Sequence, residues 1–110
     1  MAKPNTSEIR ILIELNKEKV PTRIRWKSTE EPTPQESKAM LLSLFEKETR
    51  DTYKIDLWTK EMQVTEMDRM MYQTLRGLAD TYFTATNNKE LAQEMRQFVQ
   101  YFGEQTEIVK

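Results

Sequence analysis

The sequence predicts a single α+β domain, in which a four-stranded antiparallel β-meander over residues 7–59 precedes a helical hairpin over residues 65–103. Apolar and polar side chains alternate in the first part, the period of strands, whereas apolar residues recur every three or four positions in the second. A length of 110 residues also fits one domain. We expect both helices to pack on one face of the sheet, and residues 1–6 to form a flexible tail.

The first two strands are predicted over residues 8–15 and 22–27, with a charged turn at 16–19 that leads into Val20 and Pro21 between them. Such a turn between two alternating runs predicts a hairpin. On the first strand one face consists of Ile9, Ile11, Ile13 and Leu15. On the second, a basic row of Arg23, Arg25 and Lys27 faces away from Thr22, Ile24 and Trp26.

Residues 28–37 are polar, contain two prolines and are expected to form a surface loop. The next segment, 38–46, is apolar on both faces and fits either a central strand or a short helix over 40–45. A polar tip at 46–51 and clear alternation over 52–59 favour the strand, and thus a β-hairpin over 38–59.

The first helix is predicted to begin at a capping box in Thr65–Asp68, and the second near Asn87. Gly103 is the expected C-terminal stop, and Gly77 a weak spot that allows close packing. Two apolar stripes are expected to face the sheet. They consist of Met67, Met71, Leu75, Leu78 and Tyr82 in the first helix and Leu91, Met95, Phe98 and Phe102 in the second.

Composition excludes several kinds of chemistry. Cysteine and histidine are absent, which removes thiol nucleophiles, thiolate metal sites and the commonest general base. Two glycines cannot form a phosphate-binding loop. We therefore expect no catalytic residue, cofactor or metal, although a carboxylate pair such as Asp56 with Glu61 or Asp68 is an alternative acid and base.

Charge and hydropathy bear on partners and location. A net charge of −1 does not favour a nucleic acid or an anionic membrane as partner. The first residues lack the apolar core of a signal peptide, and no apolar run approaches the about 20 residues of a membrane span. A cytoplasmic protein is expected.

A partner-binding patch is predicted on the sheet face that the helices leave bare. The strand over 38–46 has no polar face, so two helices can cover only one of its sides. An apolar patch with a charged rim is typical of protein interfaces. The candidate residues are Leu12, Arg23, Arg25, Lys54, Asp56 and Trp58. The patch could serve a protein partner or a second copy of the chain; if 38–46 were a helix, no such patch would exist.

The runs KAMLLSLF at 38–45 and IDLWTKEM at 55–62 resemble the gliding motility-associated GldC family. The similarity also takes in the strand at 7–15, the segment at 20–26 and parts of both helices, and so spans nearly the whole chain. The resemblance implies a small accessory protein of the bacterial gliding machinery, and brings with it no catalytic residue or cofactor.

The expected function is therefore binding of another protein, without catalysis, in gliding motility. The alternative is a chaperone that holds exported proteins unfolded, because four meandering strands followed by two helices is similar to the order in SecB. In that case the partner would be a component or client of secretion.

Overall fold

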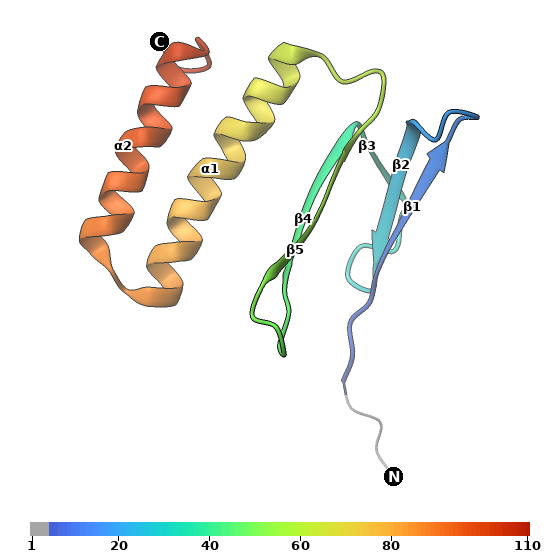
Figure 1. Cartoon of the computed structure of the whole chain (residues 1–110), viewed down its shortest axis with the longest axis horizontal. Helices are drawn as coiled ribbons and strands as arrows, with labels where there is room; N and C mark the ends of the chain where they lie inside the picture. Colours follow the sequence, from blue (N-terminus) through green and yellow to red (C-terminus); the bar gives the residue numbers. More distant parts are fainter. Residues whose placement is uncertain (1–4) are drawn as a thin grey trace. The chain divides into compact units, whose positions relative to one another are not determined.

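The computed structural model describes residues 5–110 and contains, within them, five strands and two helices (Figure 1). The chain divides into two compact units, of which the first ends at Met62 and the second is Gln63–Lys110. All five strands belong to the first unit and both helices to the second. The α+β class is confirmed, whereas the packing of the helices on the sheet remains a prediction. Most of the predicted tail at 1–6 lies outside the described residues.

The first sheet is antiparallel, with the strand order β1 (Ile9–Leu15), β2 (Pro21–Ser28), β3 (Gln35–Ser37). The predicted first hairpin is confirmed. Its turn is held by Asn16, whose Oδ1 accepts a hydrogen bond from the backbone N–H of Val20 at 3.0 Å. The predicted loop at 28–37 needs a correction, since its last three residues form β3 and pair with β2.

The two faces of this sheet differ in chemistry, as the alternation predicts. Ile13 lies opposite Ile24 across the β1–β2 ladder, so both side chains are on the same, apolar face. Ile24 is 1% exposed and is the largest fully buried side chain among the described residues. At the far end of β1, Ile9 on the same face is 69% exposed. Burial is therefore concentrated at the centre of β2.

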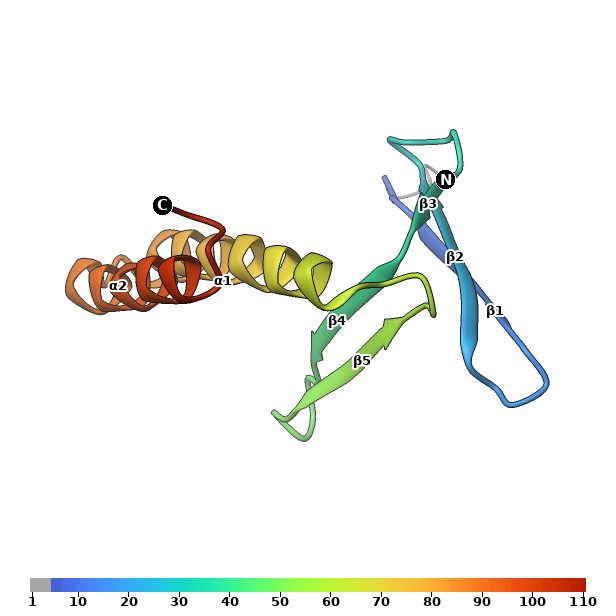
Figure 2. The same ribbon diagram turned by 90° about the horizontal axis from the view of Figure 1, so that it is seen from above.

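The second sheet is a two-stranded hairpin of β4 (Ala39–Phe45) and β5 (Thr52–Trp58), which Figure 2 shows as a separate ladder. The hairpin predicted over 38–59 is confirmed, and the alternative helix over 40–45 is wrong. The prediction of one four-stranded meander is also wrong, because the strands form one sheet of three and another of two.

The division follows from the register of β2 with β3. Arg25 lies opposite Glu36 and Ile24 opposite Ser37, so one more step would place Arg23 opposite Lys38. Like charges directly opposite each other destabilise a ladder. In addition, β2 begins at Pro21, which has no backbone N–H to offer a neighbouring strand. The chain therefore leaves β2 after Ser37 and pairs with β5 instead.

The second unit is a helical hairpin of α1 (Val64–Thr86) and α2 (Lys89–Gln105), which lie side by side (Figure 1). The first helix begins earlier than predicted, and the Gln63 N–H donates to Glu66 Oε1 at 3.0 Å. Its C-cap, Asn87, adopts the left-handed conformation that asparagine tolerates. The second helix begins as predicted near Asn87: the Oδ1 of the N-cap Asn88 accepts from the Leu91 N–H at 3.2 Å.

Small side chains lie where the two helices meet. Ala79 of α1 and Ala92 and Val99 of α2 are buried, as is Gly103. A Cβ on Gly103 would stand 2.8 Å from a ring carbon of Tyr72, which lies two turns before Ala79 on the same side of α1. Several large residues of the predicted stripes are exposed instead, namely Leu78, Leu91 and Phe98. The predicted stripes are thus not the helix–helix contact, and their packing on a sheet remains a prediction.

Both glycine predictions need correction. Gly103 does not end α2, which continues to Gln105 with Thr106 as its C-cap. It is instead the point of close approach, since a Cβ there would also overlap Val109. Gly77 allows no close packing, because nothing lies within 4 Å of a Cβ built on it.

The two glycines therefore form a matched pair for a stability test. We expect Gly103→Ala to lower the free energy of unfolding by about 1–3 kcal/mol, the usual cost of overpacking. Gly77→Ala should stabilise the protein by up to about 1 kcal/mol, since alanine is the better helix former. Neither glycine has a positive φ, so space alone separates the two substitutions. Denaturant unfolding measures both, and equal midpoints would contradict the close approach at Gly103.

Candidate functional site

The six predicted binding residues fall into two groups of three. Leu12 lies opposite Arg25 in the β1–β2 ladder, and Arg23 is two positions along the same strand, so these three share one face of the first sheet. The other three, Lys54, Asp56 and Trp58, alternate along β5 and share one face of the second sheet. A single sheet face that carries all six, as predicted, does not exist.

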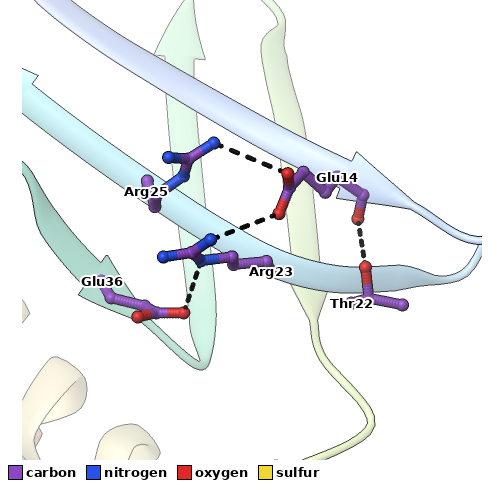
Figure 3. A network of polar contacts seen from close by, with 5 residues as sticks. All are labelled: Glu14, Thr22, Arg23, Arg25 and Glu36. Carbon is purple, nitrogen blue, oxygen red and sulfur yellow. Dashed lines mark hydrogen bonds and ion pairs between the residues drawn. The ribbon is translucent and has the colours of Figure 1, made fainter.

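A network of charged side chains covers the polar face of the first sheet (Figure 3). The Glu14 carboxylate lies 3.6 Å from an Arg25 nitrogen and 4.0 Å from an Arg23 nitrogen, and Arg23 Nε donates to Glu36 at 2.9 Å. The Thr22 hydroxyl donates to the Glu14 carbonyl at 3.2 Å. Pairs this exposed contribute little stability. Their effect is to hold the two arginines of β2 in defined positions, between Glu14 of β1 and Glu36 of β3.

Beside this network lies a basic hollow of about 310 Å³. Its lining consists of Arg10, Leu12, Arg25, Trp26, Lys27 and Pro34. Within residues 5–110, Nε of Arg25 is buried without a hydrogen-bond partner, although Nη2 of the same side chain faces Glu14. Sequence reasoning included Leu12 and Arg25 but missed Trp26, Lys27 and Pro34. The basic row was a signal for Lys27, whereas Pro34 comes close only because β3 folds back onto β2.

A second hollow, the tryptophan hollow, has a volume of about 230 Å³ and lies at the end of β5. Its lining consists of Val20, Pro21, Asp56, Leu57 and Trp58. Trp58 is 55% exposed, an unusual state for so large an apolar ring. The Asp56 carboxylate is 3.4 Å from Lys54 Nζ, which also donates to the Ser43 hydroxyl at 2.8 Å. Sequence reasoning missed Val20, at the end of the β1–β2 turn, and Pro21, the first residue of β2.

The backbone at this end of the hairpin is well anchored. The N–H of Thr59 donates to the carbonyl of Lys38 at 2.8 Å, directly beyond the last β4–β5 pair, Ala39 with Trp58. Thr59 itself is 4% exposed. The indole of Trp58 therefore projects from a backbone that is fixed on both sides, which suits a recognition surface.

Glu8 and Arg10 form the shortest ion pair at the edge of the basic hollow, with Arg10 Nε 2.6 Å from Glu8 Oε1. This hydrogen bond, together with the attraction between the two charges, lowers the pKa of the Glu8 carboxyl below its ordinary value. The same contacts raise the pKa of Arg10. Any stability from the pair is present above the ordinary carboxyl pKa and is lost as the pH falls through the lowered value.

The described residues contain no group of three or more histidine, cysteine, aspartate or glutamate side chains that could hold a metal ion. The basic hollow offers cations beside apolar surface, whereas the tryptophan hollow offers an exposed aromatic ring beside the Asp56 carboxylate. The basic hollow can therefore bind a carboxylate together with an apolar group.

A three-stranded sheet, a separate hairpin and a helical pair define a small α+β protein with surface hollows on its strands. Residues 21–108 match the family described as gliding motility-associated protein GldC-like, and the chain belongs to this family. No curated protein and no solved structure matches the chain. The family resemblance predicted from the sequence is thus confirmed over most of the chain, and it indicates a role associated with gliding motility.

Neither helix, within the part of the chain that the structure describes, is long and apolar enough to cross a membrane.

The Glu8–Arg10 pair gives a prediction that NMR can check. In Arg10→Gln, Glu8 loses its charged donor, so the pKa of its carboxyl should rise toward the ordinary value. Following the side-chain carboxyl carbon of Glu8 against pH measures this. Arg50→Gln, which removes an equal charge at the tip of the β4–β5 hairpin, is the control and should leave Glu8 unchanged. The same pKa of Glu8 in both variants would show that the pair does not form.

Proposed function

We propose that this protein is an accessory component of the gliding-motility machinery, which acts by binding another protein and catalyses no reaction. Membership of the GldC-like family supports a role in gliding motility. The mode of action is supported by the two hollows on the strands, which offer shape, charge and apolar surface.

The observation that carries the proposal is the setting of Trp58. Its ring is more than half exposed, yet it lines a hollow in which Pro21 and Leu57 supply further apolar surface. Tryptophan contributes more than most residues to protein interfaces, because it buries a large area and loses little side-chain entropy. Asp56 lines the same hollow and, with Lys54, provides a charged pair that can orient a partner.

The test replaces the anchor and compares it with a matched aromatic. Trp58→Ala should fold normally and lose most partner binding, since removal of an interface anchor costs about 2 kcal/mol or more. Asp56→Asn should weaken binding less. Tyr53→Ala is the control: this residue is 57% exposed on the same strand, but its side chain is on the opposite face. Cross-linking in gliding cells, with mass spectrometry of the products, identifies the partner, whose affinity for each purified variant is then measured.

Two results would contradict the proposal. If Trp58→Ala lowers the free energy of unfolding as much as a core substitution such as Ile24→Ala, Trp58 belongs to the core and is no anchor. If Trp58→Ala and Tyr53→Ala bind the identified partner equally well, the tryptophan hollow is not the binding surface.

A SecB-like holdase is a second candidate, favoured by one observation. Large apolar side chains are exposed on several strands and not in one place, as with Leu12 on β1 and Phe45 on β4. Scattered apolar surface suits clients that have no common shape. A holdase should suppress the aggregation of several unrelated unfolded proteins, whereas a dedicated accessory protein should suppress none.

A further inference from the structure

Strand β1 is an open edge. In the order β1–β2–β3, and among residues 5–110, β1 pairs with β2 on one side and with no strand on the other. It has seven residues and contains neither proline nor lysine, the residues that usually protect an edge. The opposite edge, β3, has only three residues. The charged residues of β1, Arg10 and Glu14, have opposite signs, so a long edge of this kind can still act as a template for a strand of complementary charge.

The hydrogen-bonding groups on this edge can be assigned from the register. The Thr29 N–H donates to the Glu8 carbonyl at 3.0 Å, just beyond the pair of Ile9 with Ser28. Opposed residues in an antiparallel ladder alternate between hydrogen-bonded and non-hydrogen-bonded pairs. Leu12 therefore points its backbone groups toward β2, whereas Ile11 and Ile13 point theirs toward the open edge.

We propose that β1 pairs antiparallel with β1 of a second copy of this chain, across a two-fold axis at Leu12. Residue pairs in this register have numbers that sum to 24, so Ile11 lies opposite Ile13 of the second copy. Both residues have their backbone groups on the open edge, and the hydrogen-bonding pattern is satisfied. Two three-stranded sheets then join into one sheet of six strands.

Charge selects this register over its neighbours. With the axis at Leu12, Arg10 lies opposite Glu14 of the second copy, and the symmetry repeats this pair of opposite charges. With the axis at Ile11, Glu8 would lie opposite Glu14, which places like charges together. With the axis at Ile13, Glu14 would lie opposite Leu12. Of these three registers, only the one with its axis at Leu12 places opposite charges of β1 next to each other.

The apolar side chains of β1 support the same occupant. Leu12, which is 61% exposed on the charged face, would meet Leu12 of the second copy between the two charge pairs. The four apolar residues of the other face would continue across the axis into a single surface. These are Ile9, Ile11, Ile13 and Leu15. A strand of unrelated sequence would bond the backbone equally well but would not match the charges.

This inference is independent of the proposed function, because it uses β1 and neither Trp58 nor the tryptophan hollow. A monomer that binds its gliding partner through Trp58 would overturn the inference alone. A dimer whose partner binding ignores Trp58 would overturn the proposed function alone.

The first test reverses the charges. In Arg10→Glu the dimer would place Glu opposite Glu14, and in Glu14→Arg it would place Arg10 opposite Arg. Each variant should self-associate at least about tenfold more weakly than the wild type. An equimolar mixture of the two should recover wild-type affinity, because both contacts then join opposite charges. The double variant Arg10→Glu/Glu14→Arg should also self-associate with wild-type affinity. Sedimentation velocity measures all five samples, with circular dichroism as the check on folding.

The second test reads the register directly and does not depend on the fold tolerating Glu14→Arg. The chain has no cysteine, so Leu12→Cys introduces one thiol at the proposed axis, where two copies face each other at disulfide distance. Under mild oxidation it should form a covalent dimer rapidly. Arg10→Cys is the control, because its two copies would stand about 14 Å apart, four residues along the strand.

A wild-type chain that stays monomeric at about millimolar concentration, roughly −4 kcal/mol of association, overturns the proposal. Protection of the Ile11 and Ile13 amides in such a monomer would mean that the chain covers its own edge. A dimer that is insensitive to Arg10→Glu, or that cross-links no faster through Leu12→Cys than through Arg10→Cys, uses another surface and also overturns it.

Discussion

The extended run from Gln35 to Phe45 pairs with two different strands in succession, and the architecture of the first unit depends on this change. Its first three residues add to β2, and after Lys38 the next seven pair with β5. Continuing along β2 would bring Lys38 opposite Arg23 and the chain alongside Pro21, so the ladder ends where charge and the missing donor oppose it. Two small sheets result, in place of one larger sheet.

This change of partner also separates the basic hollow from the tryptophan hollow. The arginines of β2 keep a polar sheet face on which Glu14 and Glu36 hold them in position. Trp58, at the end of β5, is placed beside the β1–β2 turn and not in the middle of a sheet. Each hollow thus combines charge with apolar surface, and each uses residues that are distant in the sequence.

In the helical unit, the closest contact between α1 and α2 is made by small residues, and much of the apolar surface lies outside it. Alanine, valine and glycine occupy the contact between α1 and α2, where Gly103 leaves room for the ring of Tyr72. Three aromatic side chains of α2 lie close to one another, since the Phe98 ring is 6.2 Å from that of Tyr101 and 6.3 Å from that of Phe102, centroid to centroid. Small residues at the contact let two helices approach closely. The larger apolar residues that stay exposed are then free to pack against another structural element.

The sequence by itself determined the period of every long element, the family and the chemical character of each strand face. Alternation along β1, β2 and β5 places side chains on a face whatever the neighbours are, because it follows from backbone geometry. It could not determine that residues 35–37 pair with β2, or that the strands divide into two sheets, since a run that is apolar on both faces also fits the centre of one larger sheet. Nor could it show that Gly103 and not Gly77 is the close approach, or that Val20, Pro21 and Pro34 line hollows. Those features depend on contacts between segments far apart in the chain, and only the tertiary structure decides them.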